Sequence, residues 1–298
     1  MKARMNKRIT AKIFIFLSLL AGFFPSPGKA AEIVIVADTQ LRPVEEIISG
    51  IRKTLPLFAS IEIYAPADVK GRLNEIVGQE KAKVVITLGH TALDEALKLP
   101  PTIPVIYDLV VLPPATTRPN TTGFYLATPT EKYTSLMRDH LNSIKRIAVL
   151  GSSAQLHVLA SDAPQATVYS VNDSVDFVKT VNRLETTDAV LLLPDTTVLT
   201  ATAMNEAYLF SFRKGIPLLG VSERNVREGA LAALVVDMVH VGRMIGESAT
   251  KALDGIDVGK IKPTPPAKFD LFLNTSTAMK MGIRIPDEVL AMAKRVYP

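Results

Sequence analysis

The side chains best suited to bind a small molecule follow short hydrophobic runs that are typical of buried strands. Together they offer hydroxyls, carboxylates, an amide and an imidazole. The candidates are Thr39, Gln40, Gly89, His90, Thr91, Asp108, Ser152, Ser153, Asp195, Thr196, Ser222 and Glu223. In open parallel sheets, ligands bind beyond the carboxyl ends of the strands. We therefore expect these residues to line a ligand-binding site.

Two of the candidate segments, residues 89–91 and 151–153, join a predicted strand to a predicted helix. The backbone N–H groups of a helix N-terminus favour an anion, and a carboxylate suits such a site. Asp195 and Glu223 could hold an ammonium group from another lobe through charge-assisted hydrogen bonds. In the competing interpretation, these small polar residues only cap helices. The sequence leaves both interpretations open.

Motifs for catalysis, nucleotide binding and metal binding are missing from the sequence. It contains no G-x-x-x-x-G-K-[ST], no G-x-G-x-x-G and no H-E-x-x-H. The segment at Ser222 lacks the second glycine of a nucleophile elbow. The chain has no cysteine, and the spacing of Asp195, Glu223 and Asp237 matches no metal-binding loop. We therefore expect binding without catalysis, cofactor or metal.

The scarcity of aromatic side chains bears on the class of ligand. The chain has no tryptophan, and aromatic residues make up 6% of it. Sugar-binding clefts stack the faces of pyranose rings on aromatic side chains, so a sugar is disfavoured. Amino acids, small carboxylates and nucleobase-like compounds remain.

The first thirty residues have the three parts of a secretory signal peptide. A basic region runs to Lys12, an apolar run covers residues 13–24, and a small-residue pattern ends at Ala30. We expect cleavage after Ala30 and a soluble, exported mature protein that acts in the periplasm. The alternative is a retained membrane anchor, but the apolar run has about 12 residues and a membrane span needs about 20.

The net charge of +5 has its origin in the same segment. Six of the 34 basic residues and none of the acidic ones lie in the first thirty positions, which leaves 28 basic and 29 acidic residues. The overall charge of the remainder gives no electrostatic reason to expect binding to nucleic acid or to an anionic membrane.

Strand and helix patterns alternate along the rest of the chain. With 298 residues, 48% of them hydrophobic, the chain is long enough for two domains. The predicted strands cover residues 32–37, 61–65, 83–88, 103–107, 122–126, 146–150, 166–171, 189–193, 217–221, 230–236 and 269–273. The predicted helices cover residues 43–54, 67–79, 91–97, 129–141, 200–213 and 237–254, with a terminal helix from about Pro286. This alternation predicts α/β lobes with parallel sheets.

The order of these elements also predicts the division into lobes. Six prolines in residues 100–119 interrupt the alternation, and we interpret this stretch as the first crossing between lobes. The expected division is a signal peptide at 1–30, one lobe at 31–122 plus about 238–267, and a second lobe at 123–237 plus about 268–298.

The second half of the chain contains a D-A-hydrophobic-P-x-D element at residues 187–195. Further segments follow at residues 214–222, 228–232, 242–255, 273–278 and 281–286. Together they resemble the TrpX-like ABC transporter substrate-binding proteins. Over residues 31–128 the resemblance is fainter, with Thr122-Gly123 matching a recurrent pair.

The resemblance implies a type I periplasmic-binding-protein fold of the Venus-flytrap kind, with two Rossmann-like lobes joined by three crossing strands. Such proteins capture a small solute, in the best-known cases an aromatic amino acid, and deliver it to an ABC permease in the inner membrane. The positions that match the family's cleft are Gly89, His90, Thr91, Asp195 and Ser222. One departure is Asp108-Leu109, where the family usually has an Asp-Pro pair.

The function expected is therefore that of a monomeric extracytoplasmic solute-binding protein without enzymatic activity. An amino acid or a small carboxylate is the expected ligand. Two alternatives remain: a periplasmic sensory module that signals to a membrane receptor, and a two-lobed α/β enzyme.

Overall fold

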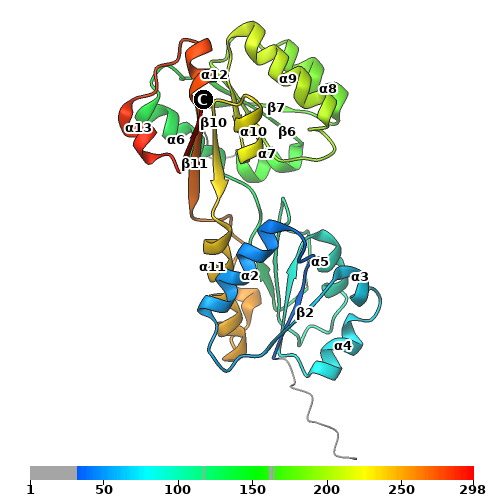
Figure 1. Cartoon of the computed structure of the whole chain (residues 1–298). Helices are drawn as coiled ribbons and strands as arrows, with labels where there is room; N and C mark the ends of the chain where they lie inside the picture. Colours follow the sequence, from blue (N-terminus) through cyan, green and yellow to red (C-terminus); the bar gives the residue numbers. More distant parts are fainter. Residues whose placement is uncertain (1–31, 117, 161–162, 164) are drawn as a thin grey trace, which may run out of the picture.

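The computed structural model describes residues 32–116, 118–160, 163 and 165–298. The predicted signal peptide lies outside the described residues. The chain forms two α/β lobes, one above the other, with a sheet in each (Figure 1). The predicted fold class is thereby confirmed. Among the residues described, none of the helices combines the length and the apolar character needed to span a bilayer.

Lobe 1 is built on a five-stranded parallel sheet in the order β2-β1-β3-β4-β5. Its strands are Ile33–Val36 (β1), Ile61–Tyr64 (β2), Val84–Leu88 (β3), Val105–Asp108 (β4) and Thr121–Gly123 (β5). Its helices are Arg42–Thr54 (α2), Pro66–Val69 (α3), Leu73–Glu80 (α4), His90–Ala96 (α5) and Met238–Leu253 (α11), with a 3-10 turn at Val258–Lys260.

Both faces of this sheet are covered, which explains why its central strands are continuous hydrophobic runs. Ile33 and Ile35 pack with residues of α2 and α11 on one face. Val34 and Val36 pack with residues of α3, α4 and α5 on the other. All four residues of β1 are fully buried.

Helices α2 and α11 approach each other closely at two glycines. A Cβ atom placed on Gly242 would lie 2.1 Å from the carbonyl oxygen of Ile47 and 2.9 Å from the Cα of Gly50. Only hydrogen atoms fit at that contact. A helix that lies between strands of lobe 2 in the sequence is thus packed into lobe 1.

Lobe 2 is built on a seven-stranded sheet in the order β12-β11-β10-β9-β8-β6-β7. Its strands are Ile147–Gly151 (β6), Ala166–Ser170 (β7), Ala189–Leu192 (β8), Leu218–Gly220 (β9), Ala232–Val236 (β10), Phe269–Asn274 (β11) and Arg295–Tyr297 (β12). Its helices are Thr130–His140 (α6), Ser153–Leu159 (α7), Ser174–Asn182 (α8), Ala201–Lys214 (α9), Glu223–Glu228 (α10), Thr275–Lys280 (α12) and Asp287–Met292 (α13). The β10–β11 pair is antiparallel, a departure from the parallel sheet that the sequence predicted.

Three segments pass between the lobes: the one after β5, the one from β10 into α11, and the one that returns to β11. The first and third run side by side, with a parallel bridge between Phe124 and Thr264. The second and third are joined by a backbone hydrogen bond from the Asp237 amide to the Lys268 carbonyl (3.2 Å) and by a salt bridge between the side chains of these two residues (2.9 Å).

The proline-rich stretch at residues 100–119 does not cross between the lobes, contrary to the prediction. Strand β4 lies inside this stretch and strand β5 follows just after it. Both strands belong to the sheet of lobe 1. Arg118 holds the loop against this lobe by donating to the carbonyls of Pro100 and Ile103 (both 2.7 Å). Prolines mark irregular backbone, but they do not determine where that backbone leads.

The helix predicted over residues 67–79 is interrupted. It divides into α3 and α4 at Gly71, which has a left-handed φ of +70°. The Gly71 amide donates to the Glu95 carboxylate of α5 at 3.0 Å instead of to a helical carbonyl. Glycine adopts this conformation without the steric cost that a side chain would add.

Candidate ligand-binding cleft

The connections between the lobes show which edges of the two sheets face each other. The chain leaves lobe 1 at the carboxyl end of β5 and leaves lobe 2 at the carboxyl end of β10. The strands that precede the candidate residues run parallel to these two. The carboxyl ends of the strands in each lobe therefore lie on the side of the other lobe, and the candidate residues lie on these two edges.

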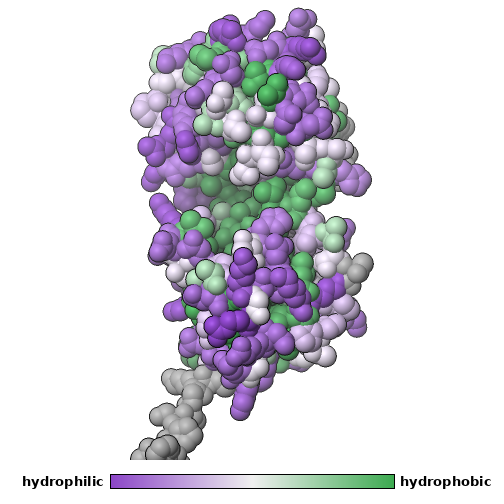
Figure 2. Space-filling model, turned by 90° about the vertical axis from the view of Figure 1, so that its right-hand side faces the viewer, coloured by the Kyte–Doolittle hydropathy of each residue, from purple (hydrophilic) through white to green (hydrophobic). Residues whose placement is uncertain are grey.

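A hollow separates the two lobes. Figure 2 shows a band of hydrophobic surface inside it, between lobe surfaces that are largely hydrophilic. Partly buried apolar side chains lie at the carboxyl ends of β4 and β10 or just beyond them, and they include Leu109, Leu112, Val235, Val236 and Met238. An apolar surface with polar groups at its margins is the usual lining of a small-molecule site.

Six of the twelve candidates have exposed side chains that make no hydrogen bond within the described part of the chain. They are Thr39, Gln40, His90 and Thr91 in lobe 1, and Ser153 and Thr196 in lobe 2. Gly89, with φ of +103°, turns the chain from β3 into α5, and its amide donates to the Asp108 carbonyl at 2.9 Å. These six polar side chains follow strands on the two facing sheet edges and have no hydrogen-bond partner among the described residues.

Three other candidates are engaged in local turns. The Ser152 hydroxyl accepts from the Gln155 amide (3.4 Å), and the Ser222 hydroxyl accepts from the Asn225 amide (3.2 Å), each within a capping box. The Asp195 carboxylate accepts from the amide and hydroxyl of Thr197 at 2.8 and 2.7 Å. These contacts agree with the capping interpretation.

Glu223 is held by the C-terminal strand. Its carboxylate accepts from Arg295 at 2.8 Å and from the Tyr297 hydroxyl. The Tyr297 hydrogen bond, with help from Arg295, lowers the pKa of Glu223 below its usual value. The sequence did not indicate this arrangement, because β12 was not predicted and the two partners lie far along the chain.

Glu223 also lines a cavity of about 620 Å³ beside the crossing from β10 to α11. Lobe 1 contributes Arg42 and Glu46, which form a salt bridge at 3.1 Å. Lobe 2 contributes Asp270, Lys294 and Arg295, along with the apolar Phe272. Because the charged groups form pairs within each lobe, this cavity offers few free polar groups compared with the edges of the hollow.

Asp108 is the most unusual of the candidates. It is fully buried at the end of β4, and neither of its carboxylate oxygens makes a well-formed hydrogen bond. Burial raises the pKa of Asp108 from 3.8 to about 7, and the nearby Leu109 amide offsets this only in part. Leu109 itself has a left-handed φ of +57°, which is uncommon for a residue with a side chain. An unpartnered buried carboxyl beside strained backbone is typical of a functional site.

The comparison with family models agrees with this two-lobed arrangement. Residues 63–297 match the model of the ABC transporter substrate binding protein family. The chain belongs to this family. A solute-binding role follows from that membership, and the resemblance noted in the sequence is confirmed. No curated protein matches this substrate-binding protein.

Several solved structures share the fold of this substrate-binding protein. A conserved domain protein from Vibrio cholerae is 21% identical, with a TM-score of 0.60 over 90% of this chain and 100% of that one. An ABC domain from Streptococcus pneumonia in complex with L-Trp is 18% identical (TM-score 0.57, 89% and 99%). The ligand-free, open structure of CD0873, a substrate-binding protein with adhesive properties from Clostridium difficile, is 16% identical (TM-score 0.67, 89% and 98%).

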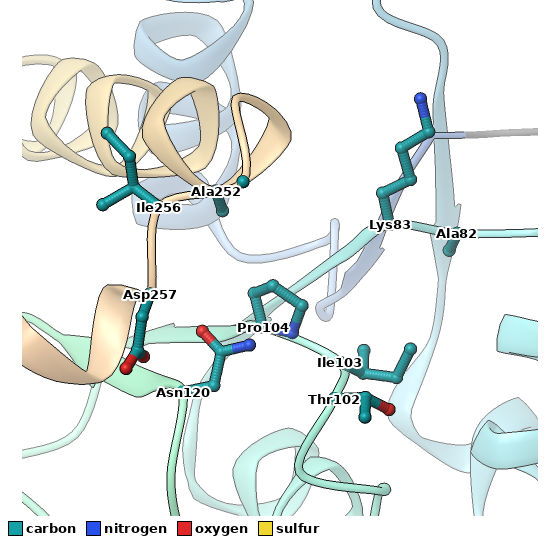
Figure 3. Close-up of a pocket in the computed structure, with 10 residues that line it drawn as sticks. Ala82, Lys83, Thr102, Ile103, Pro104, Asn120, Ala252, Ile256 and Asp257 are labelled. Atoms are coloured by element: carbon teal, nitrogen blue, oxygen red, sulfur yellow. The ribbon is translucent and has the colours of Figure 1, made fainter.

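A second cavity of this substrate-binding protein, about 460 Å³, lies at the end of lobe 1 away from the hollow (Figure 3). Its polar side chains serve the local structure. Asn120 accepts from the Val258 amide (3.2 Å) and Asp257 from the Gly259 amide (2.9 Å). Lys83 points away from it and pairs with Glu32 at 2.7 Å. Nor do the described residues contain a group of acidic and histidine side chains that could hold a metal ion.

Proposed function

We propose that this protein captures a small solute between its two lobes and delivers it to an ABC permease. The observation that carries the proposal is the pair of opposed sheet edges, which carry six exposed and unbonded polar side chains. A hydrophobic hollow lies between the two lobes (Figure 2). A ligand that touches both edges would stabilise a closed arrangement of the lobes. Closure by a hinge requires only that the ligand bind the closed state better than the open one.

The ligand we propose is an amino acid or a small carboxylate that also bears an amine. Hydroxyl and amide groups at Thr39, Gln40, Thr91 and Thr196 can donate to a carboxylate. Asp108 can accept from an ammonium group if lobe closure exposes its carboxylate, which is fully buried here, and the contact would give its oxygens the partner that they lack. The Streptococcus pneumonia structure holds L-Trp, and this supports the same class of ligand.

Ligand-induced closure is the test of this proposal. A thermal-shift screen of amino acids and small carboxylates should find a ligand that stabilises the protein by about 2.7 kcal/mol at 100 times its dissociation constant. The same ligand should lower the radius of gyration measured by small-angle scattering. Stabilisation without any compaction would argue against capture between moving lobes.

We also propose that the protein is exported and that it acts in the periplasm, as its family and the N-terminal sequence suggest. Cleavage after Ala30 would leave a mature chain that begins Ala31-Glu32-Ile33. N-terminal sequencing of protein from a periplasmic extract should read these three residues. Recovery of soluble protein that retains Met1 would contradict the proposal.

A further inference from the structure

The most exposed large hydrophobic side chains of the described chain stand side by side on one tight turn. Leu57 is completely exposed, and Phe58 is 82% exposed. They occupy the two central positions of a turn that the Ala59 amide closes onto the Pro56 carbonyl at 2.9 Å. The geometry of such a turn directs both side chains into solvent.

The turn is fixed to lobe 1 on both sides. Before it, the Leu55 amide donates to the Ile51 carbonyl and ends α2, with the Leu55 side chain buried. After it, Ser60 accepts from the amides of Glu32 and Ile33 at the start of the sheet, at 3.0 and 3.1 Å. Leu57 and Phe58 are thus presented by a supported turn and not by a long free loop. Exposed apolar groups held in this way mark an interaction surface.

Exposed basic residues lie at this end of lobe 1, together with the acidic Glu32, Asp254 and Asp257. Arg52 and Lys53 lie in the last turn of α2, are exposed, and have no ion-pair partner among the described residues. Lys83 lies next to the turn because it forms a salt bridge with Glu32, whose amide donates to the Ser60 hydroxyl. Lys251 is exposed in the last turn of α11, which ends at the same end of lobe 1 as α2 (Figure 1). The overall charge of the mature chain is close to zero, so any attraction to anions here is a local property of this end.

We propose that the turn at residues 56–59 docks the protein on an anionic phospholipid surface. Leu57 and Phe58 would enter the apolar edge of the bilayer, and Arg52 and Lys53 would contact the headgroups. Two side chains offer too little area for a stable protein interface, which buries about 1,200–2,000 Å² in total. Insertion into lipid does not require a matching surface.

The path of the chain also favours lipid as the partner. The chain enters lobe 1 beside Ser60, so the segment upstream of Glu32 leaves from this same end. That segment contains the apolar run at residues 13–24. While a signal peptide is in the membrane during export, this end of lobe 1 would lie next to the bilayer. Docking would keep it there after cleavage.

Vesicle sedimentation of the mature protein, starting at Ala31, tests the proposal. The parent protein should bind vesicles that contain phosphatidylglycerol, and Leu57→Ser with Phe58→Ser should lower the partition coefficient by about tenfold or more. Arg52→Gln with Lys53→Gln should weaken binding to these vesicles but not to phosphatidylcholine alone, and added salt should have the same effect. Leu209→Ser with Phe212→Ser, an exposed apolar pair on α9, is the matched control and should bind as the parent does.

Three results would overturn the proposal. They are a parent protein that does not bind vesicles, serine variants at the turn that bind equally well, and a parent that forms a dimer which those variants abolish. The last would assign the turn to a second copy of the chain. Because the turn lies far from the hollow, the variants should keep the melting temperature and the ligand response of the parent. The proposal therefore stands or fails independently of solute capture.

Discussion

Asp108→Asn is expected to make the ligand-free protein more stable, and the gain should depend on pH. Burial raises the pKa of Asp108 to about 7, whereas an unfolded chain has its ordinary value of 3.8. The folded protein therefore loses stability as the pH rises from about 4 to about 7, by up to about 4 kcal/mol. The neutral amide removes this loss. Denaturant unfolding should show the largest gain at pH 8 and almost none below pH 4.

The same substitution should impair solute capture. If an ammonium group of the ligand binds the Asp108 carboxylate in the closed state, the amide should weaken binding by about tenfold or more. Asp195→Asn is the matched control, because Asp195 already accepts hydrogen bonds within its own turn. Titration calorimetry on both variants separates the two carboxylates. A stabilised Asp108 variant with unchanged affinity would leave Asp108 a buried structural carboxyl, and weaker binding only in the Asp195 variant would move the amine site there.

Fully buried strands were the part of the fold that the sequence predicted best. β1 and β3 are continuous runs of β-branched and aliphatic residues because helices cover both faces of the sheet. The short strand β12 has two exposed residues and lies on the edge of its sheet, so it shows no such pattern. The division of residues 67–79 depends on the conformation of Gly71, which is decided by a contact with Glu95 from a later helix.

The candidate site shows a similar limit. Position after a strand places twelve residues on the two facing edges, but it does not tell which side chains are already engaged. For Ser152 the signal was present, because Ser152 and Gln155 have the spacing of a capping box. For Glu223 it was absent, because its partners Arg295 and Tyr297 lie more than seventy residues away. The unpartnered state of Asp108 is likewise a result of packing and cannot be read from neighbours in sequence.

The second large effect is expected from a substitution at the close contact between helices α2 and α11, which should lower the stability of the protein. Gly242→Ala would place a methyl group 2.1 Å from the Ile47 carbonyl oxygen and 2.9 Å from the Gly50 Cα. Both are backbone atoms, so the helices must move apart, and the buried residues between them lose contact. Overpacking of a core costs about 1–3 kcal/mol, and a backbone clash belongs at the upper end of that range or beyond. We expect a loss of about 3 kcal/mol in the free energy of unfolding, measured with urea.

Gly78→Ala is the matched control, since a Cβ there meets no atom within 4 Å and the residue lies in helix α4. It should stabilise the protein by about 0.5–1 kcal/mol. A Gly242→Ala variant as stable as the parent would show that the two helices are not in backbone contact.

The contact between α2 and α11 also affects lobe closure, because α11 begins directly after the crossing at Asp237. A looser α2–α11 contact weakens the attachment of that crossing to lobe 1. Gly242→Ala should therefore show less compaction with ligand than Gly78→Ala does, measured by scattering at a temperature where both remain folded.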